Sequence, residues 1–137
     1  MPALRLFPVL FALAGLTAGC GRGPSVHVAA QNDAREPVLS AELDAAGDTL
    51  RLGRLGPGAR TVQRWRLRPA HAGDGDYGVR LALAGGDTLA GRIGHFTGGR
   101  PDARSLVVVL SDTALALRVY EGGVLLGARE RTRTLPR

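Results

Sequence analysis

Cys20 is the only cysteine of this 137-residue chain, and small residues lie directly before it. In the run Thr17-Ala18-Gly19-Cys20 no bulky side chain would keep the catalytic groups of a processing enzyme away from the backbone. A thiolate is a far better nucleophile near neutral pH than a hydroxyl group. A single cysteine also cannot form a disulfide within one chain. We therefore expect Cys20 to be a site of cleavage and covalent modification.

An apolar segment, Leu6 to Leu16, precedes this cysteine, and Arg5 is the only charge ahead of the segment. Its length suits a secretion signal and falls short of the roughly 20 residues that a membrane-spanning helix needs. Pro8 also disfavours a regular membrane helix. We therefore predict that residues 1–19 are a cleaved signal peptide and that residues 20–24 form a tether.

Residues 17–20 resemble the lipobox of bacterial lipoproteins, in which the cysteine receives a diacylglycerol thioether and the signal is removed before it. Thr17 stands where leucine is commonest, and Leu16 lies one position earlier. The resemblance implies lipidation of Cys20 and attachment to a membrane of the cell envelope. Gly21, which is not aspartate, favours the outer membrane, facing the periplasm. The alternative is an ordinary secreted protein in which Cys20 is a free thiol.

The full chain carries a formal net charge of +6, and all 18 of its basic residues are arginine; removing Arg5 with the signal peptide lowers the net charge to +5. Such a surface could attract anionic headgroups or other polyanions. Arginines that alternate with Asp and Glu through most of the chain instead favour a soluble domain with scattered charges. Few aromatic residues and no recognisable binding module argue against nucleic acid as a partner.

From Ser25 onward the apolar residues alternate with period two, which is typical of strands. Turn signals recur at roughly 8–12-residue spacing, as in two-sheet proteins. They include an Asn32-Asp33 turn, the break at Gly56-Pro57-Gly58, where proline fixes φ, and a hairpin turn at Gly85-Gly86. The predicted fold is all-β: an antiparallel immunoglobulin-like sandwich of about seven or eight short strands.

This sandwich is predicted to span residues 25–122. Residues 123–137 are predicted to be a C-terminal extension. From Arg129 onward the only apolar side chain is Leu135, so we expect the end of this extension to be disordered. The run Leu106 to Leu110 is apolar throughout, which predicts a central strand buried on both faces.

Three segments resemble small bacterial lipoproteins that contain an immunoglobulin-like sandwich, and also modules of adhesion and surface proteins. They are the turn Leu52-Gly53-Arg54-Leu55-Gly56-Pro57-Gly58, the motif Gly94-His95-Phe96-Thr97-Gly98-Gly99, and the run Leu106 to Leu110. The resemblance implies a fold and a location. It carries no activity and no cofactor.

The search for reactive residues gives one weak candidate site. The serines lie outside any Gly-x-Ser-x-Gly motif, so we expect no enzyme and no cofactor. His71, Asp74 and Asp76 share one short segment, and two carboxylates at this spacing can reach a Ca²⁺ ion. The further acidic ligands of a calcium loop are missing, so an Asp-Gly turn is the favoured interpretation.

A possible interaction surface includes Arg64, Arg66 and Arg68, which alternate with Trp65 and so share one face of a strand. They are interpreted as charges that prevent edge pairing, or alternatively as a cationic strip for lipid or an acidic partner. Trp65 faces the other way and is predicted to be buried, with its indole N–H bonded.

His95 and Phe96 are the other candidates for this surface, as rim contacts for a ligand. The alternative is a packed aromatic ring beside a hydrogen-bonded histidine. We expect a lipid-anchored, non-catalytic module that binds an envelope protein or glycan. The alternative function is a carrier of a small ligand or metal ion.

Overall fold

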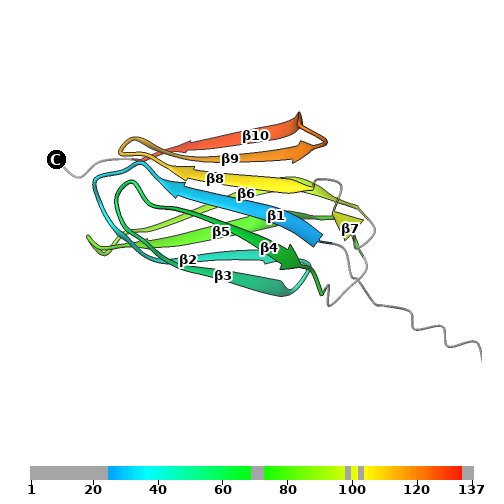
Figure 1. The fold of residues 1–137 in the computed structure, drawn as a ribbon, viewed down its shortest axis with the longest axis horizontal. Helices are drawn as coiled ribbons and strands as arrows, with labels where there is room; N and C mark the ends of the chain where they lie inside the picture. The colour runs from blue at the N-terminus through cyan, green and yellow to red at the C-terminus, as the bar shows by residue number, and fades with distance from the viewer. Residues whose placement is uncertain (1–24, 69–72, 98–99, 102–103, 134–137) are drawn as a thin grey trace, which may run out of the picture.

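The computed structural model describes residues 25–68, 73–97, 100–101 and 104–133, which form two β-sheets packed face to face (Figure 1). The first sheet has the strand order β10-β9-β8-β1-β4, and the second has the order β3-β2-β5-β6-β7. The strands are β1 (Ser25–Asn32), β2 (Val38–Ala45), β3 (Asp48–Leu55), β4 (Arg60–Arg66), β5 (Gly75–Leu83), β6 (Thr88–Thr97), β7 (Arg100–Pro101), β8 (Ser105–Leu110), β9 (Ala114–Glu121) and β10 (Val124–Thr132).

The sequence predicted seven or eight strands, and the runs of alternating residues correspond to β1 to β6, β8 and β9. In β1, for example, Val26 and Val28 are buried while His27 between them is exposed. The β2–β3 hairpin turns through Ala46 and Gly47, both with positive φ. Two such residues form the turn whose twist matches that of paired strands. The all-β, two-sheet class predicted from the sequence is confirmed.

The prediction of purely antiparallel pairing was wrong at one position. β1 pairs with β4 in the antiparallel sense but with β8 in the parallel sense, with Ala29 opposite Val107. Parallel neighbours need a long crossover connection. Here the chain between β1 and β8 passes through the whole second sheet, so no hairpin fixes the direction of β8 relative to β1.

The C-terminal segment is also more ordered than predicted, because β10 pairs with β9 as far as Thr132. Every β10 residue except Gly127 is exposed, so the strand lacks the alternation that marks the others. Backbone pairing holds it in place, and Arg131 Nη1 donates to the Ala90 carbonyl of β6 at 2.8 Å. Residues 134–137 lie outside the described part of the chain.

The apolar run in β8 is central in its sheet but is not buried on both faces. Leu106, Val108 and Leu110 are buried, whereas Val107 and Val109 are half-exposed on the outer face. This sheet is covered on one side only, so the second set of valines lies at its outer surface.

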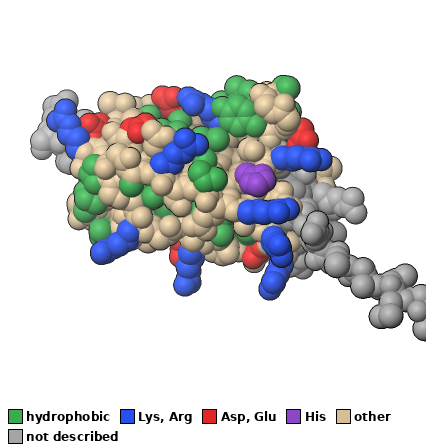
Figure 2. Space-filling model, in the orientation of Figure 1, with side chains coloured by type: hydrophobic (Ala, Val, Ile, Leu, Met, Phe, Trp, Pro, Cys, Tyr) green, Lys and Arg blue, Asp and Glu red, His purple; other side chains and the backbone are tan. Residues whose placement is uncertain are grey.

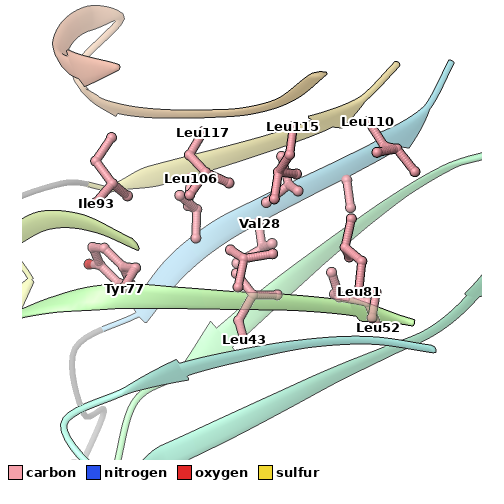
Figure 3. Close-up of a cluster of buried hydrophobic side chains, with 14 of the residues drawn as sticks. Val28, Leu43, Leu52, Tyr77, Leu81, Ile93, Leu106, Leu110, Leu115 and Leu117 are labelled. Atoms are coloured by element: carbon pink, nitrogen blue, oxygen red, sulfur yellow. The ribbon is translucent and has the colours of Figure 1, made fainter. Parts of the chain in front are cut away.

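The core lies between the sheets and draws large side chains from both (Figure 3). Val28, Leu106 and Leu117 of the first sheet face Leu43, Tyr77 and Leu81 of the second. Trp65 is buried, as predicted, although its strand is an edge strand. Its ring lies 6.4 Å from that of Tyr77, and its Nε1 donates to Asp48 Oδ2 at 3.1 Å.

Asn32 is the one buried polar side chain among the described residues, and all its polar atoms have partners. Its Nδ2 donates to the carbonyl oxygens of Glu36 and Leu55, both at 2.9 Å, and its Oδ1 accepts from Ala34 N at 3.0 Å. Its backbone N–H donates to Ala59 O, and its carbonyl accepts from Gly58 N. One residue thus joins the β1–β2 loop to the end of β3 and to the turn before β4.

Replacing Asn32 with alanine leaves two carbonyls and one N–H without their partner in a buried site. We expect the Asn32→Ala variant to lose about 2 kcal/mol or more of unfolding free energy in urea, because unsatisfied buried groups cost about 1–3 kcal/mol. Asp33→Ala is the control, since that side chain is exposed and should change stability by less than about 0.5 kcal/mol. Equal losses in the two variants would contradict the role of Asn32.

Glu36 ties three segments together at the same end of the sandwich. Its Oε1 accepts from Gly85 N at 2.6 Å, and its Oε2 accepts from Arg133 Nη2 at 2.8 Å. The hydrogen bond from Gly85 and then the Arg133 guanidinium lower the pKa of Glu36 below its ordinary value of 4.5. The side chain of Arg133 is 7% exposed, so this pair is shielded on the arginine side.

A carboxyl whose pKa is lowered by folding stabilises the fold above its unfolded pKa and loses that contribution as the pH falls through the folded value. We therefore expect Glu36→Gln to lower the unfolding free energy at pH 7 and to reduce its fall below pH 4.5. Chemical denaturation across the acid range measures both effects. Glu42→Gln is the control, because the Glu42–Arg51 pair is exposed and such pairs contribute little. An unchanged acid limb in Glu36→Gln would contradict the assignment.

Candidate functional site

The arginines of β4 lie where the alternating pattern placed them, on the solvent side of the strand. Arg64 and Arg66 are exposed, and so is Arg68 just beyond the strand end, while Trp65 and Leu67 are buried. Arg64 Nε donates to Ser25 Oγ of β1 at 3.1 Å. Among the described residues, no carboxylate lies within ion-pairing distance of these three guanidinium groups. They are therefore free to meet an external anion.

β4 is an edge strand of the first sheet, and this position supports the interpretation that its arginines prevent pairing between chains. An edge strand presents unpaired backbone groups, and charged side chains along it discourage a second chain from adding there. The partner of β4 on its other side is β1, with Arg64 opposite His27. The same charges also lie on the outer face of the sheet, where an anionic partner could contact them.

The outer face of the first sheet has an apolar centre beside this strip. Val62 of β4 is 61% exposed, and it lies in register with Ala29 of β1, Val107 of β8 and Arg118 of β9. Figure 2 shows this face, with arginines and one histidine around scattered hydrophobic side chains. Exposed apolar side chains beside arginines are typical of surfaces that bind another protein.

The proposed metal ligands are only partly described, and one of them has another partner. Asp76 Oδ1 accepts from Arg92 Nη1 at 2.7 Å, and Arg92 Nη2 lies 3.2 Å from Asp44 Oδ2. The hydrogen bond that Arg92 donates to Asp76 and the charge of Asp44 raise the pKa of Arg92. Asp74 is exposed, and His71 lies outside the described residues. Within the described ranges, no three metal-ligating side chains gather at one point.

The other two kinds of candidate cannot be placed by their side chains. His95 and Phe96 belong to β6, with Phe96 opposite Gly75 and Pro101, but their side chains are not among those described. Cys20 precedes the first described residue. Within the part of the chain that the structure describes, no helix has the length and apolarity of a membrane span.

A cleft between the two sheets was not predicted from the sequence. It has a volume of about 240 Å³, and Leu115 and Leu117 of β9, Gly91 of β6 and the β10 segment 129–131 line it. A Cβ at Gly91 would lie 3.0 Å from Leu117 Cδ1, so glycine allows β6 and β9 to approach closely here. Gly91 is visible in the sequence, but one wall of the cleft is β10, which the sequence did not predict. The glycine alone therefore could not indicate a cleft.

Comparison with known proteins adds no family to this picture: no protein-family model matches the chain, and no curated protein is significantly similar to it.

Removing two β4 arginines separates an edge-protecting role from a structural one. We expect the double variant Arg64→Ala with Arg66→Ala to keep its unfolding free energy within about 0.5 kcal/mol, because exposed residues without ion pairs contribute little. Its self-association in analytical ultracentrifugation should increase, since the edge loses its charges.

The matched control is Arg80→Ala with Arg118→Ala, which removes the same charge from the interior strands β5 and β9. Equal association of the two double variants would show that net charge, and not the edge position, keeps the chains apart.

Proposed function

We propose that this chain is a bacterial envelope lipoprotein, anchored by a lipid on Cys20, whose β-sandwich is a non-catalytic interaction or structural module. The observation that carries the proposal is the order of the chain: an apolar segment, a lone cysteine after small residues, and then a domain that begins at Ser25. The finer immunoglobulin-like likeness and a location on the outer membrane, facing the periplasm, belong to the same proposal.

The structure supports this arrangement through its core. Every buried apolar residue of the described chain lies between Val26 and Val119, so the described strands supply a hydrophobic core of their own. Only four residues separate Cys20 from Ser25. A lipid on this cysteine would therefore hold a self-contained domain close to the membrane surface. Two or three acyl chains exceed what stable anchoring requires.

The surface offered to an envelope partner is the outer face of the first sheet. Its apolar centre at Val62, Ala29 and Val107 is flanked by Arg64 and Arg118. Apolar contacts surrounded by arginine are the composition that protein interfaces favour. A protein with acidic groups around an apolar patch would complement this face.

A carrier of a small ligand is the second candidate, and the cleft beside β10 is the observation that favours it. Leu115 and Leu117 give the cleft an apolar lining on the β9 side, and Arg129 and Arg131 line it on the β10 side. At about 240 Å³ it is smaller than the roughly 300–1,000 Å³ of most ligand pockets. It would therefore take only a small anionic molecule.

The proposal is tested in cells with a photo-crosslinking residue at Val107, in the natural chain and in the Cys20→Ser variant. We expect labelled fatty acid to enter the natural chain and not the variant, because the thiol is the acceptor of the lipid. Irradiation should join Val107 of the anchored chain to one partner of defined mass.

A crosslinking residue at Leu39 is the control, because this exposed side chain belongs to the second sheet. The same product from both positions would indicate random collision and contradict a specific interaction face. Fatty acid in the Cys20→Ser variant would contradict the anchor.

A further inference from the structure

One end of the sandwich brings three features of the two edges and the amino end together. β1 begins there at Ser25, β4 ends there at Arg66, and the β9–β10 hairpin turns there at Gly122 and Gly123 (Figure 1). Because β1 follows the proposed anchor directly, this is the end nearest to Cys20 along the chain. We call it the proximal end.

Exposed apolar side chains are concentrated at the proximal end. Val124, Leu125 and Leu126 follow the hairpin turn and are 64%, 51% and 38% exposed. The other large apolar side chains that the described residues expose, Leu39 and Val62, lie on different sheets. Figure 2 shows a group of hydrophobic side chains over the β9–β10 hairpin. A run of three such residues on a surface strand is unfavourable in water unless something covers it.

The strand register connects this hairpin to the arginines of β4. Leu125 is opposite Tyr120 of β9, which is opposite Ser105 of β8. Ser105 is opposite His27 of β1, which is opposite Arg64 of β4. These five residues form one row across the whole sheet. The row is about 19 Å long, because neighbouring strands lie about 4.8 Å apart.

The row is therefore apolar at the β10 edge and cationic at the β4 edge. Arg66 and Arg68 extend the cationic edge and, like Arg64, are exposed without a carboxylate partner among the described residues. Of the acidic groups described nearby, Glu121 pairs with Arg104 at 3.0 Å, whereas Asp48 accepts from two uncharged donors, Trp65 Nε1 and Arg68 N, and keeps its negative charge beside the three arginines. The free charges of this end are thus mainly positive.

The length of the tether limits what can cover this end. Five residue steps from Cys20 to Ser25 span at most roughly 17 Å even when fully extended. The strands themselves are about 25 Å long, since each residue of a strand adds about 3.3 Å. A lipid on Cys20 therefore keeps the proximal end near the headgroups whatever the domain's tilt.

We propose that the proximal end docks on the bilayer itself, with Val124, Leu125 and Leu126 entering the interface and Arg64, Arg66 and Arg68 facing anionic headgroups. This inference rests on the proposed lipid anchor and adds an orientation to it. Surface-bound apolar groups typically enter the headgroup region by about 5–10 Å, and cations close to an anionic surface are attracted within a Debye length. The apolar centre at Val62 then stays accessible to a partner.

The test places a tryptophan at Leu125 in the chain that begins at Cys20, which contains the whole described core. The thiol of Cys20 is coupled to a maleimide-headgroup phospholipid in anionic vesicles, so the tether is supplied even if cells do not lipidate the chain. Vesicles with nitroxide-labelled lipid then report depth by quenching. The signal of buried Trp65, measured in the unsubstituted chain, is subtracted.

Val62→Trp is the matched control, because Val62 is 61% exposed, against 51% for Leu125, and lies on the same sheet but at the edge opposite the hairpin. We expect the emission of Leu125→Trp to shift to shorter wavelength and to be quenched severalfold more than that of Val62→Trp. Equal quenching at both positions would overturn the docking and leave the anchor intact. The proposal of a lipid anchor is tested separately, because without lipidation of Cys20 no fatty-acid label would enter the chain in cells.

A second copy of the chain is the competing occupant of the hairpin surface. In that case the emission of Leu125→Trp would shift without vesicles and more strongly as protein concentration rises. That outcome would also overturn the proposal.

Discussion

The side chain of Asn32 determines how one end of this sandwich is held together. Burying an amide is unfavourable unless each polar atom finds a partner, and here the β1–β2 loop and the last residue of β3 supply them. The backbone of the same residue binds the turn before β4. Strands of both sheets therefore meet at one side chain, and Glu36, Gly85 and Arg133 extend the connection to β5–β6 and to the end of β10.

Much of the fold could be predicted from the sequence, because period-two alternation is visible wherever one face of a strand is buried. Trp65, Leu81 and Val28 all face inward as the pattern indicated. β10 was missed for the complementary reason: it contributes no buried side chain, so its existence depends on backbone pairing that leaves no trace in side-chain hydropathy. The parallel pairing of β1 with β8 was missed because register between distant segments is set by the whole sheet.

The surface features that follow from local spacing could also be predicted, and those that depend on distant segments could not. The exposed face of the β4 arginines followed from their spacing, but their place at a sheet edge, with no carboxylate nearby among the described residues, did not. Asn32 was predicted only as a turn residue, since the partners of its side chain come from segments up to 23 positions away. Asp76 was considered as a metal ligand, and Arg92 on the neighbouring strand takes up one of its oxygens instead. Distant partners decide what a polar side chain does, and a single sequence does not display them.

The parallel pairing of the first strand with the eighth also bears on the order in which the molecule is built. β1 is synthesised ahead of the rest of the described domain, yet its two neighbours, β4 and β8, begin at Arg60 and Ser105. Contacts so far apart in the chain form slowly, and unpaired strands are prone to aggregate in the meantime. This topology favours folding only after the chain has been synthesised through β8, because β1 has no parallel neighbour before then.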